Sequence, residues 1–243
     1  MEIGILCLFT MEEKDTESTD HFGDTSQDRD MMLKPHKLPR PEIDPKKPLL
    51  KALRSRRTTR EIKRRKLPLR ILSALLWAAW GINRPKGPFG MAGRTAASAS
   101  NSQEIDLYIV LEEGIYLYEP LHHSLVPVRA GDFRPLAIGP GQAEFAGAAP
   151  VHLVYVADIR KLTHTSGFQE PGLQDPEIQK SYYFVDTGLI AGNVYLFAAA
   201  HGLASWFHNC NKPALAQKMQ LRPDQRVLFG QTIGYPEKKK PPQ

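Results

Sequence analysis

Residues Arg94–Gln103 read RTAASASNSQ, and they run directly into Glu104–Leu111, which reads EIDLYIVL. Apolar residues alternate in the second stretch, the pattern of a strand with one buried face: they are Ile105, Leu107, Ile109 and Leu111. Small hydroxyl residues in the first stretch allow a ligand to approach the backbone. Asn101 and Gln103 add amides that can donate and accept hydrogen bonds. The two stretches predict a ligand-binding loop that opens a strand, or else an ordinary polar loop in the same place.

More strands follow toward the C-terminus. A Glu-Glu-Gly turn after Leu111 predicts a hairpin with a second strand at Ile115–Tyr118, and Leu125–Val128 adds a third short strand. The near-continuous apolar run PVHLVYVAD at Pro150–Asp158 is typical of an interior strand. A last strand, Val227–Ile233, ends at Gly-Tyr-Pro. Helices interrupt these strands without strict alternation, so the predicted fold class is α+β.

Four segments have the apolar spacing of helices: they are Leu49–Leu53, Leu69–Gly81, Val185–Leu203 and Pro213–Met219. The third is the longest. It is apolar nearly all round, which predicts a helix buried at the centre of the molecule or in a dimer interface. Asp186 lies at its predicted start. That side chain could reach a pocket, but an N-cap is the favoured interpretation because Asp is among the preferred N-cap residues.

Basic residues concentrate near the N-terminal end of the predicted domain. Eight of the thirteen residues from Arg54 to Lys66 are Lys or Arg. Within this run, the segment Arg56–Arg60 (RRTTR) puts three guanidiniums and two hydroxyls at the end of a helix, where they can clamp a phosphate. A solvated basic patch is the simpler interpretation of such a run. A nucleic-acid arm is disfavoured because no aromatic residues interleave the cations.

A third segment with chemical character is Gly202–Cys210, GLASWFHNC, just past the long helix. It could place an apolar shelf and backbone N–H groups against a flat ring, or it could be a loop that packs Trp206 and Phe207 into the core. Cys210 lies two residues from His208, but no third group orients the pair, so covalent catalysis is not expected. The remaining histidines are interpreted as surface and core residues, with no metal site.

The composition indicates one domain preceded by an arm. The 243 residues are 42% hydrophobic, enough to bury a substantial core. Residues 1–48 are acidic and then proline-rich, which predicts a disordered or extended arm, so the domain is expected at 49–243. Two distant cysteines, Cys7 and Cys210, predict no disulfide and a reducing compartment. No run reaches membrane length, so we expect a cytoplasmic protein without membrane or nucleic-acid partners.

The order of these segments is more specific than any one of them. A helix ends in Arg-Arg-Ser/Thr-x-Arg/Lys, a serine-rich Asn-x-Gln loop opens a strand, a long Ala-rich helix ends in Gly-Leu, and a last strand closes on Gly-Tyr-Pro. In that order the sequence resembles the nitroreductase superfamily from about Leu49 to Pro236. It is most similar to the branch that contains the azoline dehydrogenases of thiazole and oxazole peptide biosynthesis. The resemblance implies a mostly antiparallel central sheet flanked by helices, with the long helix at a homodimer interface.

The resemblance also implies a non-covalently bound FMN. The basic motif would contact its phosphate and ribityl chain, the serine-rich loop would reach the flavin bound mainly to the other subunit, and the segment after the Gly-Leu helix end would face flavin N5. A C-terminal lysine pair would complete the phosphate site. Arg60 would lie near the pyrimidine edge, where its charge stabilises the reduced flavin, so it is the one residue implied to act in catalysis. The implied cofactor-binding residues are Arg56, Arg57, Thr58, Arg60, Ser98, Ala99, Ser100, Asn101, Gln103, Asn209, Cys210, Lys238 and Lys240.

The implied reaction is hydride transfer from NADH or NADPH to flavin N5, followed by reduction of a small-molecule acceptor such as a nitro compound or a quinone. The sequence departs from the family pattern at Ala97, where proline is usual, and at the bulky segment Phe207–Cys210, so we expect the pocket over the flavin to be reshaped. Three alternatives stay open: a dehydrogenase of the azoline-oxidising type, a non-enzymatic basic-surface or nucleic-acid-binding protein, and a flavin-binding module without turnover.

Overall fold

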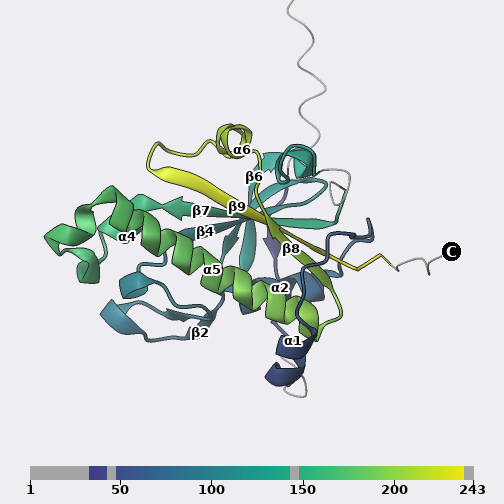
Figure 1. The fold of residues 1–243 in the computed structure, drawn as a ribbon, viewed down its shortest axis with the longest axis horizontal. Coiled ribbons are helices and arrows are strands. Elements are labelled where there is room, and N and C mark those ends of the chain that lie inside the picture. Colours follow the sequence, from purple (N-terminus) through teal and green to yellow (C-terminus); the bar gives the residue numbers. More distant parts are fainter. Residues whose placement is uncertain (1–32, 43–47, 143–147, 238–243) are drawn as a thin grey trace, which may run out of the picture. The chain divides into compact units, whose positions relative to one another are not determined.

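The structure is a computed structural model that describes residues 33–42, 48–142 and 148–237. Over these residues the centre is one antiparallel sheet of seven strands, in the order β1-β6-β5-β4-β7-β9-β8 (Figure 1). A separate hairpin joins β2 (Ile82–Arg84) to β3 (Gly93–Arg94). The strands of the sheet are β1 (His36–Lys37), β4 (Ile105–Val110), β5 (Gly114–Glu119), β6 (Ser124–Ala130), β7 (Val151–Asp158), β8 (Ala204–His208) and β9 (Gln225–Gly234). The predicted α+β class with a mostly antiparallel sheet is confirmed.

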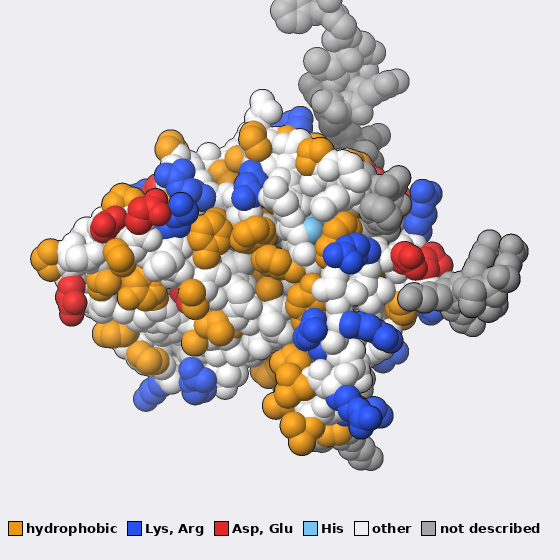
Figure 2. Space-filling view, viewed as in Figure 1, with side chains coloured by type: hydrophobic (Ala, Val, Ile, Leu, Met, Phe, Trp, Pro, Cys, Tyr) orange, Lys and Arg blue, Asp and Glu red, His pale blue; other side chains and the backbone are white. Residues whose placement is uncertain are grey.

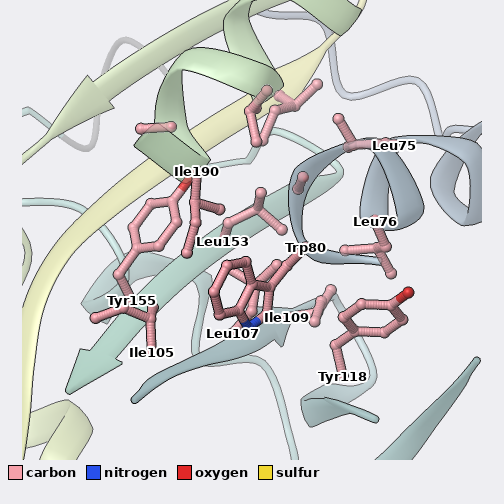
Figure 3. Close-up of a cluster of buried hydrophobic side chains, with 14 of the residues drawn as sticks. Leu75, Leu76, Trp80, Ile105, Leu107, Ile109, Tyr118, Leu153, Tyr155 and Ile190 are labelled. Atoms are coloured by element: carbon pink, nitrogen blue, oxygen red, sulfur yellow. The ribbon is translucent and has the colours of Figure 1, made fainter. Parts of the chain in front are cut away.

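Helices cover both faces of this sheet (Figure 1). α2 (Leu69–Trp80) and α5 (Pro176–Ala200) cover one face, and α6 (Lys212–Lys218) covers the other. The remaining helices are α1 (Leu49–Ser55), which packs on α5, and α4 (Ile159–Thr163). Alternation along the strands decides which helix each side chain meets. Leu107 of β4 belongs to the core with α2 and α5, whereas its neighbour Tyr108 belongs to the core that includes Leu215 of α6. Figure 3 shows the first core, where Trp80 and Leu76 of α2 lie among strand residues.

The long helix begins earlier than the sequence predicts. α5 starts at Pro176, and Asp175 is its N-cap, with Oδ1 accepting a hydrogen bond from the Glu177 backbone N–H at 2.8 Å. Asp186 therefore lies in the middle of the helix, and its interpretation as an N-cap is wrong. The first turns lack the apolar stripe of the rest because the polar run EIQKS at residues 177–181 interrupts it.

By length and composition alone, α5 is long and apolar enough to cross a membrane, so the prediction that no run reaches membrane length is wrong. Its inner face, however, packs against the sheet, where Ile190 and Val194 are fully buried. The outer face stays exposed at Val185 and Leu189. α5 therefore packs on the sheet with one face and leaves the other face exposed.

The N-terminal edge of the domain also differs from the prediction. Strand β1 pairs His36 with Leu125 of β6, and the following Leu38 is buried in the main core. The His36 Nε2 atom lies 3.1 Å from the Tyr116 hydroxyl. The compact unit therefore starts at Leu33, before the predicted boundary at residue 49.

Candidate functional site

The predicted cofactor-binding residues that the structure describes fall into two main groups, and both pack on α5. One group is the basic segment, Arg56–Arg60, which follows α1. Its chain runs beside the edge strand β8, where the Thr59 backbone N–H donates to the Ser205 carbonyl at 3.0 Å. Just beyond it, Ile62 forms a bridge with Pro236, which follows β9. The last strands of the sheet therefore fix the path of the basic segment.

Aromatic rings position the guanidiniums of the basic segment. The Arg56 guanidinium lies 5.5 Å from the centre of the Tyr195 ring on α5, and the Arg60 guanidinium lies 5.4 Å from the Trp206 ring on β8. Arg57 is exposed, as are these two arginines. Among the described residues none of the three guanidiniums pairs with a carboxylate. Their charge is therefore available to an anionic ligand.

A strand stands where the sequence predicts a loop. Within Gly202–Cys210, the residues Ala204–His208 form β8 and pair with β9, so the loop prediction is wrong. The Phe207 backbone N–H, one of those expected near flavin N5, donates instead to the Tyr195 hydroxyl at 2.9 Å. The same hydroxyl lies 3.1 Å from the Thr58 Oγ1. Tyr195 thus connects the basic segment to β8.

The second group is the serine loop, Ser98–Gln103, which precedes β4. Three of its residues have positive φ: Ser100 at 48°, Asn101 at 54° and Gln103 at 51°. Such a backbone is disfavoured for residues other than glycine, and it persists only where surrounding contacts hold it. One such contact is the Ser100 hydroxyl, which donates to the Gly167 carbonyl at 2.7 Å.

The polar side chains of the serine loop form hydrogen bonds with backbone groups of the loop itself and of the preceding segment. The Gln103 Nε2 donates to the Ala92 carbonyl at 2.7 Å, and the Asn101 Nδ2 donates to the Pro88 carbonyl at 3.1 Å. The Ser98 hydroxyl accepts a hydrogen bond from the Gln103 backbone N–H at 3.0 Å. These amides, predicted from sequence as flavin contacts, therefore hold the shape of the loop.

A buried pair of acids lies beneath the serine loop. The Asp186 Oδ2 accepts a hydrogen bond from the Ala99 backbone N–H at 2.8 Å. Glu104 is fully buried, and its Oε2 accepts from the Ser102 hydroxyl at 2.7 Å. Burial, and then the neighbouring Asp186 charge, raise the pKa of Glu104 to about 8, and burial also raises the pKa of Asp186. At neutral pH Glu104 therefore keeps its proton.

The sequence did not identify Glu104 as part of the site. The sequence feature that could have identified it is a carboxyl group directly after the Asn-x-Gln loop, at the start of a largely apolar strand. Its acidic partner Asp186 comes from a distant helix, so only the tertiary structure reveals the pair.

The two groups lie on opposite sides of α5. The serine loop meets the helix at Asp186, and the basic segment meets it at Tyr195. These positions are nine residues apart, which corresponds to about 13 Å along the axis and roughly half a turn around it. Within one copy of the chain, therefore, α5 separates the serine loop from the basic segment.

The remaining predicted residues lie at the end of β8 and beyond. Asn209 is exposed, whereas Cys210 is buried, and burial raises the pKa of its thiol to about 11. A thiol that stays protonated at physiological pH is a poor nucleophile. Lys238 and Lys240 lie outside the described residues. Within the part of the chain that the structure describes, no cluster of three His, Cys, Asp or Glu could hold a metal.

His208 belongs to a buried chain of hydrogen bonds. Its Nε2 lies 2.7 Å from the Thr232 hydroxyl oxygen, which lies 2.9 Å from the Nδ1 of His152. Burial lowers the pKa of His152 to about 3, so that ring is neutral at physiological pH. Burial also lowers the pKa of His208. This chain links three neighbouring strands and has the character of a structural network.

Known proteins are similar to this chain in sequence and in fold. A family model described as the nitroreductase family matches residues 53–235, which include the basic segment and the serine loop. A curated protein of Methanocaldococcus jannaschii, named as a nitroreductase, is 30% identical over 157 residues, which is 62% of this chain and 72% of that protein.

Solved structures extend the comparison. A crystal structure from Ralstonia eutropha, described as a nitroreductase, is 35% identical with a TM-score of 0.73, over 85% of this chain and 91% of that one. A chain of the Escherichia coli microcin synthetase complex is 17% identical with a TM-score of 0.60, over 93% and 85% of the two chains. The NADPH:FMN oxidoreductase of Vibrio harveyi, solved with NAD+, is 18% identical with a TM-score of 0.56, over 80% and 72%. At such low identity, these last two show a shared fold alone.

Proposed function

The chain belongs to the nitroreductase family, a family of flavin-type oxidoreductases, and from that premise we propose that it is an FMN-dependent oxidoreductase of the cytoplasm. Bound FMN would supply the hydride carrier between NADH or NADPH and a nitro compound, a quinone or a similar acceptor. The observation that carries the proposal is the basic segment, with exposed guanidiniums that have no carboxylate partner among the described residues.

The basic segment fits the phosphate of FMN. Arg56 lines an open hollow at the end of α1 together with Arg54 and Arg57, and Thr58 places a hydroxyl next to these cations. Guanidiniums bind phosphate oxygens through paired hydrogen bonds. Arg60 is held against the Trp206 ring. There it would keep a fixed positive charge beside the flavin, which stabilises negative charge on the reduced ring.

The serine loop would serve the flavin held mainly by a second copy. One observation that supports this is the position of the serine loop, which lies across α5 from the basic segment. Another is the set of apolar residues that α1 and α5 leave exposed (Figure 2). The exposed fractions are 60% for Leu49, 78% for Leu50, 49% for Leu53, 60% for Val185 and 45% for Leu189. Exposed apolar residues of this kind commonly mark an interface between protein chains. We therefore propose a homodimer whose two cofactor sites each take the basic segment from one copy and the serine loop from the other.

The first test is the visible spectrum of the full-length protein before and after anaerobic addition of NADH or NADPH. Oxidised flavin bands near ~370 and ~450 nm that bleach on addition are the expected result. Bands that persist would favour a dehydrogenase of the azoline-oxidising type, reduced by its own substrate. A colourless protein that FMN cannot reconstitute would overturn the proposal and favour a basic-surface binding protein.

A further inference from the structure

A second polar hollow lies beside the serine loop. It opens between the chain that leads into β3 and the residues around the end of α4. Six of the residues that line it carry the argument: Phe89, Met91, Arg94, Gln103, Lys161 and His164. The hollow lies on the serine-loop side of α5, away from the basic segment proposed to hold the FMN phosphate.

Arg94 is the group in this hollow whose charge is least satisfied. Its Nε donates to the Gln103 Oε1 at 2.6 Å, and its Nη1 donates to the Trp80 carbonyl at 3.3 Å. Both acceptors are neutral, and the guanidinium also lies 5.3 Å from the centre of the Trp80 ring. Burial lowers the pKa of the guanidinium, and among the described residues no carboxylate lies within ion-pair distance of it. A ligand anion would therefore offset part of the desolvation of this cation.

The other two basic residues that line the hollow, Lys161 and His164, differ in how far their polar atoms are satisfied. Lys161 forms an ion pair with Asp106, so its charge is largely compensated. His164 is exposed, and its Nδ1 lies 2.9 Å from the Arg160 carbonyl oxygen, which leaves Nε2 without a hydrogen bond among the described residues. The polar side of the hollow therefore favours a negatively charged group.

Two other residues that line the hollow are apolar and exposed. Phe89 is 57% exposed and Met91 is 43% exposed. Phe89 has a φ of 56°, and its ring packs so closely on Gly167 that a Cβ there would come within 2.6 Å of the ring. Since the Ser100 hydroxyl bonds the same Gly167, this ring lies next to the serine loop. Phe89 and Met91 thus lie near a guanidinium that has no ion pair among the described residues, and this combination suits a flat ligand with one anionic substituent.

We propose that this hollow binds the carboxylate or phosphate group of an aromatic electron acceptor, with Arg94 contacting the anion and with Phe89 and Met91 packing on the ring. The inference rests on the proposed reductase function, and it narrows the acceptor to acidic aromatic compounds. It also places the acceptor next to the serine loop, and so next to the flavin that the loop would contact.

Binding of benzoate tests the hollow without any turnover. We expect the full-length protein to bind benzoate at least roughly tenfold more tightly than benzamide, because the amide lacks the charge-assisted hydrogen bond. Calorimetric titration of wild type, Arg94→Gln and Arg94→Lys measures the difference. The glutamine variant should lose the preference, and the lysine variant should keep part of it. Lys86→Gln is the matched control. Lys86 lies in the connection between β2 and β3, it is exposed, and it does not line the hollow.

Equal affinities for benzoate and benzamide in the wild-type protein would overturn the inference. So would a preference that survives in Arg94→Gln. If the glutamine variant unfolds, Arg94→Lys gives the decision, because a benzoate preference undiminished in that variant would also overturn the inference.

Turnover separates this inference from the reductase proposal. With 4-nitrobenzoate and 4-nitrobenzamide as acceptors, we expect a preference of similar size for the acid, expressed mainly in KM, and its loss in Arg94→Gln. Reduction of both compounds at equal kcat/KM would overturn the hollow as an acceptor site and leave the reductase intact. Reduction of neither, with the benzoate preference present, would overturn the reductase proposal and leave the anion site standing.

Discussion

The basic segment and the serine loop lie on opposite sides of the same helix, and they are built in opposite ways. The basic segment presents exposed guanidiniums that rest on two aromatic rings. The serine loop has three residues with positive φ, and its side chains donate to the carbonyls of Gly167, Ala92 and Pro88. One region offers charge that is still available to a ligand, whereas the other offers a backbone shape that exists before any ligand arrives.

This difference predicts where substitutions will act. An exposed guanidinium with no ion pair among the described residues contributes little to folding, so its loss should weaken cofactor binding and leave stability nearly unchanged. The positive-φ backbone of the serine loop costs about 1–3 kcal/mol for each disfavoured residue, and the hydrogen bonds that hold it must offset this cost. Changes beneath the serine loop should therefore alter stability together with binding.

The largest expected effect is on FMN affinity in the charge-reversed variant Arg56→Glu/Arg57→Glu. Replacing two charge-assisted contacts by repulsion should weaken FMN binding by roughly a thousandfold or more. Fluorescence titration with FMN measures the loss. The melting temperature should stay close to that of wild type because both side chains are exposed. Wild-type FMN affinity in this variant would contradict the assignment of the phosphate site.

Mixed dimers test whether each cofactor site takes residues from both subunits. Gly167→Val should displace the serine loop, since a Cβ at Gly167 would lie 2.8 Å from the Ser100 Cβ. A dimer of one Arg56→Glu/Arg57→Glu subunit and one Gly167→Val subunit keeps one intact composite site, so about half of the wild-type flavin content is expected. Flavin content near zero in the mixed dimer would mean that each site lies within one subunit.

The second expected effect is a dependence of stability on pH that originates beneath the serine loop. The pKa of Glu104 is raised from its ordinary value of 4.5 to about 8 in the folded state. Below pH 4.5 both states hold the proton. Between about pH 4.5 and 8 the unfolded state releases it and the folded state keeps it, so the free energy of unfolding falls across that window and levels off above it.

Glu104→Gln should remove this loss while keeping a donor and an acceptor in place. Relative to wild type, the variant should gain stability from pH 4.5 to pH 8, on the order of a few kcal/mol. Urea unfolding at the two pH values measures the gain. Glu113→Gln is the control, because Glu113 is exposed and has no ion pair among the described residues. Parallel pH profiles for wild type and Glu104→Gln would show that Glu104 is ionised in the folded protein.

Local pattern was sufficient for most of the fold. The prediction for β7 is correct within one residue, and that for α2 is equally close, because apolar spacing encodes both elements directly. The first turns of α5 were missed because their residues are polar and are stabilised by the Asp175 cap. β8 was interpreted as a loop because it is short and lies at the sheet edge, where pairing with β9 decides its structure.

The sequence predicts a site residue where the residue type alone determines what the side chain can bind. The arginines of the basic segment suit a phosphate wherever the chain places them, so sequence could name them. The amides of Asn101 and Gln103 were identified as ligand contacts, but their hydrogen bonds to Pro88 and Ala92 depend on a turn that residue types do not reveal. Glu104 was missed for the same reason, since its role depends on Asp186.

The smallest expected effect concerns the hydroxyl that ties the basic segment to β8. Tyr195→Phe leaves the Phe207 backbone N–H without its 2.9 Å acceptor and frees Thr58, so a loss of about 1 kcal/mol in stability is expected. FMN affinity should fall only a few-fold, since the arginines remain. Tyr182→Phe on the same helix is the matched control, because its ring packs on Phe168 and its hydroxyl has no hydrogen bond among the described residues. Urea unfolding and FMN titration of both variants give the comparison. Equal losses in the two variants would mean that the ring packing of α5, rather than this hydroxyl, holds the basic segment in place.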